Sequence, residues 1–164
     1  MANCVGSLLL KPAHLISRSE LEATLAANLV TAFAVTRAGA RTMQEGGGSI
    51  VLVSSAAASL GLANHEAIAA AKAGVEGLVR SAAATYAGWN VRVNAVAPGL
   101  VRTDLTTSIT GRPASLEAAR KLHPLGRIGS ASDVAEAIVF LLGQSWITGQ
   151  VLGVDGGLAR VRSR

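Results

Sequence analysis

The fold class of this chain is decided by residues 49–78, SIVLVSSAAASLGLANHEAIAAAKAGVEGL. The stretch opens on four aliphatic residues, Ile50 to Val53, with no polar residue before Ser54. Such a run predicts a strand buried on both faces, as parallel sheets require. An alanine-rich helix is expected from about Asn64 to Ala87, with Asn64 as its cap and Glu66 in its first turn. A buried strand followed by a helix indicates an α/β fold.

The flanking segments continue the same alternation of helix and strand. Residues 19–44 predict a long amphipathic helix, which Ser17 or Ser19 caps and the EGGG sequence at 45–48 ends. After a helix stop at Gly88, a second buried strand is expected over residues 90–99, NVRVNAVAPG. The remaining expected elements are a loose loop at 100–122 with a short helix at 115–121, a helix capped by Ser132 that runs to Gly143, and a last strand within 148–157. This order predicts a parallel sheet with helices on both faces.

Composition and charge exclude several classes of function. The chain has 164 residues and a net charge of +5, but its Lys and Arg residues are scattered and no basic run alternates with aromatics. The densest basic stretch, ARVRSR at the C-terminus, is interpreted as a solvated tail, so no nucleic-acid partner is expected. No apolar run is long enough to span a bilayer, and no membrane association is expected.

The cysteine and histidine content carries two further expectations. Cys4 is the only cysteine, so no internal disulfide can form, which fits a reducing cytoplasm. The chain starts with no signal-peptide pattern, and a cytoplasmic location is therefore predicted. The three histidines, His14, His65 and His123, are far apart and have no metal-ligand spacing, so no metal site is expected.

Six motifs in the same order resemble the C-terminal half of a short-chain dehydrogenase/reductase. They are NCVGS (3–7), ANLVTAF (27–33), SSAAASLGLANHEAIAAAKAGVEGL (54–78), RVNAVAPGLVRTDL (92–105), HPLGRIGSASDVAEAIVFLL (123–142) and ITGQVLGVDGG (147–157). The resemblance implies a partial Rossmann-like doubly wound fold over residues 1–164 as a single domain. It also implies NAD or NADP as cofactor, hydride transfer with a small carbonyl or alcohol substrate, and a homodimer or homotetramer.

The chain departs from the family pattern at its beginning. It starts where the family's fourth strand should end, and the family's TGxxxGxG turn has no counterpart. EGGG at 45–48 is no substitute, because it precedes a strand, whereas a phosphate-binding turn follows a strand and opens a helix. The domain is therefore expected to be N-terminally truncated. One copy is expected not to build a full dinucleotide site, and NAD is not distinguished from NADP.

The resemblance assigns three catalytic positions and leaves a fourth without its expected chemistry. Ser55 would polarise the substrate carbonyl, Lys72 would bind the nicotinamide ribose, and Asn28 would hold a proton-relay water. The family's catalytic tyrosine, however, corresponds to Ile68. The alternatives are that Ser55 only ends a strand, that Lys72 is a solvated surface lysine, and that Asn28 makes structural hydrogen bonds.

Further residues are assigned to the cofactor by the same resemblance. They are Asn3, Gly6, Lys72, Pro98, Gly99, Val101 and Thr103. Within this set, Val101 and Thr103 would meet the nicotinamide carboxamide and phosphate, while Pro98 and Gly99 would set the turn. The alternative is an ordinary turn at the end of a strand.

The missing phenol leaves the proton donor open. The only tyrosine, Tyr86, lies fourteen residues beyond Lys72, about 21 Å along a continuous helix, and cannot reach the site. Water and His65 remain as donors, since His65 lies near the same helix face and imidazole titrates near neutral pH. An exposed, idle His65 is the alternative.

A non-catalytic module is the second hypothesis for the whole chain. It would associate with itself or with a full-length relative through its Asn28 helix and through a second helix face. That second face is formed by Ala69, Ala73, Glu76 and Arg80. A related expectation is that IVLVS forms an exposed, aggregation-prone sheet edge unless the first eighteen residues cover it.

Overall fold

A four-stranded parallel sheet forms the centre of the computed structural model, which describes residues 1–162. The strand order is β1 (Ala2–Asn3), β2 (Gly48–Val53), β3 (Val91–Pro98) and β6 (Val151–Val154). All three pairings are parallel, as the aliphatic runs predict. The sequence-based α/β fold with a parallel, Rossmann-like sheet is therefore confirmed. The last two residues of the basic tail lie outside the described residues.

The IVLVS strand is not an exposed edge, because the start of the chain covers it, which is the condition that the sequence-based expectation named. Strand β2 lies inside the sheet, because β1 pairs with it on one side and β3 on the other. Ala2 lies opposite Val51, and the Met1 carbonyl accepts a hydrogen bond from the Val51 N–H at 2.9 Å. The first residues of the chain thus satisfy backbone groups of β2 that would otherwise face outward.

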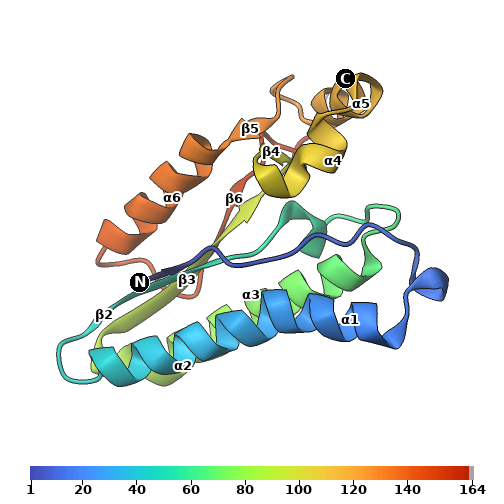
Figure 1. Cartoon of the computed structure of the whole chain (residues 1–164). Helices are drawn as coiled ribbons and strands as arrows, with labels where there is room; N and C mark the ends of the chain where they lie inside the picture. The colour runs from blue at the N-terminus through green and yellow to red at the C-terminus, as the bar shows by residue number, and fades with distance from the viewer. Residues whose placement is uncertain (163–164) are drawn as a thin grey trace.

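Helices cover both faces of the sheet, as Figure 1 shows. On one face lie α1 (Arg18–Leu25), α2 (Thr31–Met43) and α3 (Glu66–Tyr86), and on the other lies α6 (Ala131–Gly143). Successive side chains of β2 point to opposite faces of the sheet, so the hydrophobic core has two parts, one on each face. Ile50 and Leu52 pack in the same cluster as Val75 and Val79 of α3, while Val51 packs with Ile138 and Leu141 of α6.

The long first helix contains a π-helical turn that the sequence pattern does not indicate. Residues Ala26–Val30 form this turn between α1 and α2, so the segment is one rod with one irregular turn. Its start matches the expectation, because Ser17 and Glu20 form a reciprocal capping box. A π-turn places an extra residue in the helix and is often found at functional sites. Here it contains Asn28.

Three expected helix boundaries are wrong. Asn64 has a left-handed backbone with φ of 64°, so His65 is the residue that precedes α3. The left-handed residue after α3 is Asn90, with φ of 56°, and not Gly88, which lies inside a short 3-10 turn. Ser130, two residues before Ser132, caps α6 through a capping box with Asp133. In two of the three cases the residue that takes the position, Asn90 or Ser130, has a capping propensity similar to that of the expected one.

The loop at 100–122 has more structure than its sequence indicates. It holds β4 (Val101–Arg102), α4 (Thr107–Thr110) and α5 (Pro113–Leu122), and the last of these extends the short helix expected at 115–121. Strand β4 pairs with β5 (Gly129–Ser130) in a separate two-stranded sheet. These elements lie together beyond the carboxyl ends of β3 and β6 (Figure 1).

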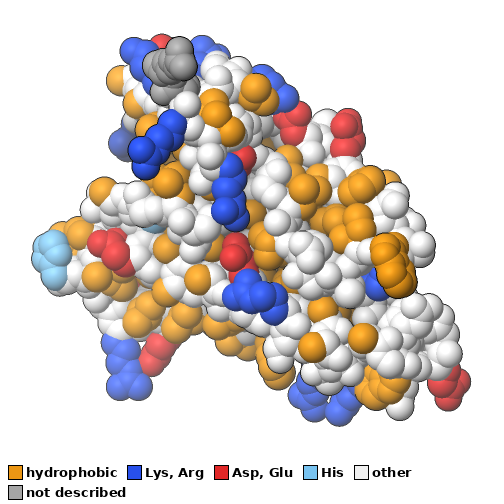
Figure 2. Space-filling model, turned by 180° about the vertical axis from the view of Figure 1, so that it is seen from behind, with side chains coloured by type: hydrophobic (Ala, Val, Ile, Leu, Met, Phe, Trp, Pro, Cys, Tyr) orange, Lys and Arg blue, Asp and Glu red, His pale blue; other side chains and the backbone are white. Residues whose placement is uncertain are grey.

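None of the helices in residues 1–162 has the length and apolar character needed to cross a membrane. The same residues hold no group of three or more His, Cys, Asp or Glu side chains arranged to hold a metal ion. On the face drawn in Figure 2, Lys and Arg side chains lie at separate places and form no single basic patch.

Candidate functional site

The candidate site lies where the carboxyl ends of three neighbouring strands meet. Gly6 follows β1, Ser55 follows β2, and the segment from Pro98 to Thr103 follows β3. Because the strands are parallel and adjacent, these three segments lie at one edge of the sheet. Crevices at the carboxyl ends of parallel strands are the usual ligand sites of open α/β sheets.

Lys72 is buried, with only 7% of its surface exposed. Its ammonium donates a hydrogen bond of 2.8 Å to the carbonyl of Val53, the last residue of β2. No carboxylate forms an ion pair with it among residues 1–162. Burial therefore lowers the pKa of Lys72 to about 8, because removal from water disfavours the charged form. A solvated surface lysine, the alternative drawn from the sequence, does not match this position.

Gly6 brings the β1 segment against Lys72 and Asn28. A Cβ atom at Gly6 would lie 2.9 Å from Asn28 Oδ1 and 3.6 Å from Lys72 Nζ. The first distance is too short for a real contact, so glycine is the residue that this close approach allows. The three residues that the family resemblance assigns to cofactor and catalysis thus meet at one point.

Asn28 makes hydrogen bonds with both ends of its side-chain amide. Its Nδ2 donates to the Thr24 carbonyl at 2.9 Å and to Ser7 Oγ at 3.0 Å, and its Oδ1 accepts from the Ser7 N–H at 3.3 Å. These bonds tie the π-helical turn to the segment that follows β1. They support the structural interpretation of Asn28, and its role toward a relay water stays a prediction.

Ser55 caps the 3-10 turn Ala56–Ala58 that follows β2. Its Oγ accepts a hydrogen bond from the Ala57 N–H at 3.2 Å. Within the described part of the chain the Ser55 hydroxyl proton has no acceptor, so this proton is free to be donated to a ligand carbonyl. The adjacent Ser54 is buried and donates to Glu76 Oε1 at 2.9 Å, which fixes the strand end against α3.

Ile68 lies one helical turn before Lys72, and both side chains are buried. The two residues share one face of α3 because they are four positions apart. Tyr86 is at the opposite end of α3, where its ring stacks on Trp89 at a centroid distance of 5.3 Å. His65 precedes the helix, and its Nδ1 lies 2.8 Å from the Ala63 carbonyl oxygen. No phenol therefore lies near Lys72 in residues 1–162.

The remaining assigned residues lie at the carboxyl ends of β1 and β3 or in the segment that follows β3. Asn3 is buried, and its Oδ1 accepts a hydrogen bond from the Val5 N–H at 3.2 Å. Pro98 ends β3, and the Gly99 N–H donates to the Val154 carbonyl at 3.2 Å. Val101 is half-buried in β4, and the exposed Thr103 caps the 3-10 turn Asp104–Thr106. All the assigned residues therefore come from the strand ends or from the helices beside them.

Comparison with known proteins shows which family the chain belongs to. A family model described as enoyl-(acyl carrier protein) reductase matches residues 1–159. Carbonyl reductase family member 4 of Danio rerio is 43% identical over 147 residues, which cover 88% of this chain and 60% of the relative. The chain belongs to the short-chain dehydrogenase/reductase family. The 3-oxoacyl-[acyl-carrier-protein] reductase of Rattus norvegicus is 45% identical over 131 residues, 80% of this chain and 53% of the relative.

A solved short-chain dehydrogenase supports the fold over nearly the whole chain. The gluconate 5-dehydrogenase of Burkholderia cenocepacia, solved in complex with NADP and tartrate, superposes with a TM-score of 0.94 at 29% identity. The match covers 98% of this chain and 64% of the dehydrogenase. The chain thus spans between about half and two thirds of the length of the relatives it matches.

The residues present fit the nicotinamide ribose of the family's cofactor. An ammonium has three N–H donors, and Lys72 uses one of them on Val53, which leaves two for ribose hydroxyls. Gly6 leaves room beside this ammonium where any side chain would fill the space. For the pyrophosphate, residues 1–162 contain no glycine-rich turn that follows a strand and opens a helix, since Gly47 leads into β2.

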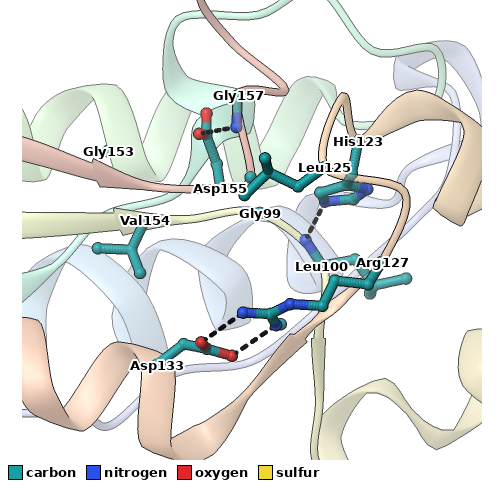
Figure 3. A pocket seen from close by; sticks show the side chains of 12 residues that line it. Gly99, Leu100, His123, Leu125, Arg127, Asp133, Gly153, Val154, Asp155 and Gly157 are labelled. Carbon is teal, nitrogen blue, oxygen red and sulfur yellow. Dashed lines mark hydrogen bonds and ion pairs between the residues drawn. The ribbon is translucent and has the colours of Figure 1, made fainter.

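One buried histidine beside the Pro98–Thr103 segment was not singled out by the sequence analysis. His123 is 4% exposed and lies in a cavity of about 300 Å³ next to Gly99 and Leu100 (Figure 3). Twenty-three residues separate it from the turn that it contacts. A single histidine before a proline carries no local pattern that predicts such a contact. The three histidines have no metal-ligand spacing in the sequence, and this does not bear on the contact between His123 and Leu100.

The depressed pKa of Lys72 predicts a pH dependence of stability. Between about pH 8 and the ordinary lysine value of 10.5, the unfolded chain binds a proton that the folded chain has released. Stability therefore rises with pH through this window, because the cost of burying the ammonium is relieved. We expect the free energy of unfolding in urea to increase from about pH 7 to about pH 10 more in the wild type than in Lys72→Met. An identical pH dependence in the two proteins would contradict the assigned burial of the charge.

Proposed function

We propose that the chain carries the nicotinamide-binding part of an NAD(P)-dependent oxidoreductase. The reaction is hydride transfer between the nicotinamide and a small carbonyl or alcohol compound. The observation that carries the proposal is the buried Lys72 ammonium beside Gly6 at the carboxyl ends of β1 and β2. The ammonium has spare donors and no anionic partner among residues 1–162, and the hydroxyls of a polar ligand would satisfy these donors.

Each residue then has a definite task. Lys72 holds the ribose hydroxyls, and Gly6 and Asn3 lie along the same side of the cofactor. The free Ser55 proton is donated to the substrate carbonyl oxygen, which withdraws electron density from the carbon that receives the hydride. The Pro98–Thr103 segment borders the nicotinamide. The cofactor, when bound, supplies the hydride.

The weak point of this site is proton transfer. Ile68 has no ionisable group, so the proton for the product alcohol comes from water or from His65. General acid catalysis contributes about 100- to 10,000-fold in rate. We therefore expect turnover well below that of a relative with a phenol at this position.

The substrate class follows from the chemistry of the site and from the relatives. Ser55 is suited to a neutral carbonyl oxygen, and the two similar proteins named above are a carbonyl reductase and a 3-oxoacyl reductase. We propose a small ketone, with 3-oxoacyl thioesters as the first compounds to assay.

The proposal is tested with two ligands that each correspond to one half of the cofactor. NADPH and NADH are titrated against the protein while fluorescence is followed, and bound NADPH is then challenged with nicotinamide mononucleotide or with AMP. Lys72 and Gly6 are assigned to the binding of the nicotinamide ribose. We therefore expect nicotinamide mononucleotide to compete with bound NADPH and AMP to compete poorly. No fluorescence change with either dinucleotide, or competition by AMP alone, would overturn the proposal.

A second candidate function, association without catalysis, is favoured by one observation. Val30 and Phe33 are 59% and 58% exposed on the rod formed by α1 and α2. Ala73 and Arg80 of α3 are exposed as well, whereas Glu76 is engaged by Ser54. Large apolar side chains exposed on neighbouring helices are typical of an interface between copies of a chain.

This association predicts a change in particle mass. Phe33→Asp is expected to shift the protein from dimer or tetramer to monomer in light scattering, because it places a charge in an apolar contact. Glu22→Gln, a change at an exposed residue of the same rod, is the control and should leave the mass unchanged. A wild-type monomer would exclude association between copies of this chain.

A further inference from the structure

His123 lies directly after α5, and both nitrogens of its imidazole are engaged. Nε2 is 3.1 Å from the Leu100 backbone nitrogen (Figure 3). Nδ1 is 2.7 Å from the Ala119 carbonyl oxygen. The residue is buried, with 4% of its surface exposed. The ring therefore links the end of α5 to the turn between β3 and β4.

These two partners fix the protonation state of the ring. A backbone N–H only donates, so Nε2 must present its lone pair to Leu100. A carbonyl oxygen only accepts, so Nδ1 must carry the proton. This is the neutral imidazole with its proton on Nδ1. In the imidazolium form Nε2 also carries a proton, which would then face the Leu100 N–H, and the hydrogen bond would be lost.

The turn is built around the ring. A Cβ atom at Gly99 would lie 2.6 Å from His123 Nε2, so the backbone touches the imidazole at a point that only glycine allows. The Leu100 carbonyl accepts from the Gly129 N–H at 2.8 Å, which starts the pairing of β4 with β5. The conformation of the turn thus determines where β4 and Thr103 begin.

We propose that His123 is a positioning residue, whose neutral imidazole holds the Gly99–Thr103 segment in place and whose protonation releases it. The inference rests on the proposed function only where it assigns the Gly99–Thr103 segment to cofactor binding. The hydrogen bond itself and its loss in acid do not depend on a cofactor. His123 acts through Leu100 and touches no reacting atom.

The charged groups around the ring are already engaged or exposed. Asp155 and Arg127 line the same cavity with Asp133 of α6. Asp155 accepts from the N–H groups of Gly157 and Ala159, and Arg127 pairs with Asp133 at 2.7 and 2.8 Å. On α5 itself, Arg120 and Lys121 are exposed. No hydrogen bond joins any of these charged groups to the ring among residues 1–162.

The test is amide hydrogen exchange at Leu100, measured by NMR without cofactor. The rate is expressed as a protection factor, so that the intrinsic pH dependence of exchange is removed. We expect Leu100 protection to fall roughly tenfold between about pH 8 and about pH 5, which is the size of one hydrogen bond. The Ala95 amide in β3, which donates to the Gln150 carbonyl, should keep its protection.

Two variants separate the titration of His123 from its packing. His123→Gln places an amide oxygen near the position of Nε2, so Leu100 should stay protected at both pH values. His14→Gln removes an exposed histidine and should keep the wild-type response. If His123→Gln is too unstable to study, the His123 ring is followed directly in the wild type. The ring must then titrate over the same pH range as the Leu100 protection.

Two results would overturn the inference: wild-type Leu100 protection that is constant with pH, or a pH response that persists in His123→Gln. A separate titration with NADPH tests the link to the cofactor. We expect affinity to fall in acid for the wild type and to stay constant for His123→Gln. Absence of NADPH binding would refute the proposed function, while the Leu100 response would still decide the role of His123.

Discussion

Ile68→Tyr is expected to raise the rate of NADPH oxidation by about 100- to 10,000-fold with a small 3-oxoacyl thioester as substrate. The new phenol would start one helical turn before Lys72, on the same buried face of α3. The Lys72 ammonium would lower the phenol pKa toward working pH, as a nearby positive charge does. Tyrosine would then donate the proton that Ile68 cannot.

The matched control for this gain is Ile68→Phe. Phenylalanine brings the same ring into the same buried position, so both variants carry a similar packing cost of about 1–3 kcal/mol. Only the hydroxyl differs between them. Equal rates for the tyrosine and phenylalanine variants would show that Ile68 does not occupy the proton-donor position, and the catalytic assignment of Ser55 and Lys72 would be lost with it.

Lys72→Met is expected to weaken nicotinamide nucleotide binding by about 10- to 100-fold, the loss of hydrogen bonds from a charged donor. Methionine keeps most of the apolar length of the side chain, so the packing of α3 against β2 is largely retained. Lys121→Met, at an exposed position of α5, is the control and should bind as the wild type does.

The pKa of Lys72 also leads us to expect that nucleotide affinity and the free energy of unfolding respond to pH in opposite directions. The pKa of Lys72 is about 8, so the charge that holds the ribose disappears above this pH. Wild-type affinity should therefore fall from about pH 7 to about pH 10, while the free energy of unfolding rises. Calorimetric titration at the two pH values measures the first effect. Wild-type affinity that does not change with pH would remove Lys72 from the binding site.

The fold was largely predictable because its signals are local. The aliphatic runs of β2 and β3 and the alanine-rich α3 indicate their structure without reference to distant residues. The helix boundaries were less predictable. Asn64 and Asn90 favour both capping and left-handed conformations, and Ser130 and Ser132 are equally good caps, so tertiary packing decides between them.

The site was predictable only in part. The resemblance gave the positions of Ser55, Lys72 and Gly6, and the structure adds that Gly6, Asn28 and Lys72 meet within a few ångströms. The π-helical turn at Asn28 could not be anticipated, because no residue type or spacing in the sequence marks where an extra residue enters the helix. The contact of His123 with Leu100 depends on how α5 returns to the sheet, which no local pattern encodes.

The central claim is that one nucleotide-binding cleft joins the carboxyl ends of β1, β2 and β3. The direct measurement is the mapping of amide chemical shifts during titration with NADP. The largest changes should fall on Gly6 and Ser7, on Ser55 to Ala57, and on Leu100 to Thr103. Changes confined to α6 or to the exposed face of α2, with these three segments unmoved, would contradict it.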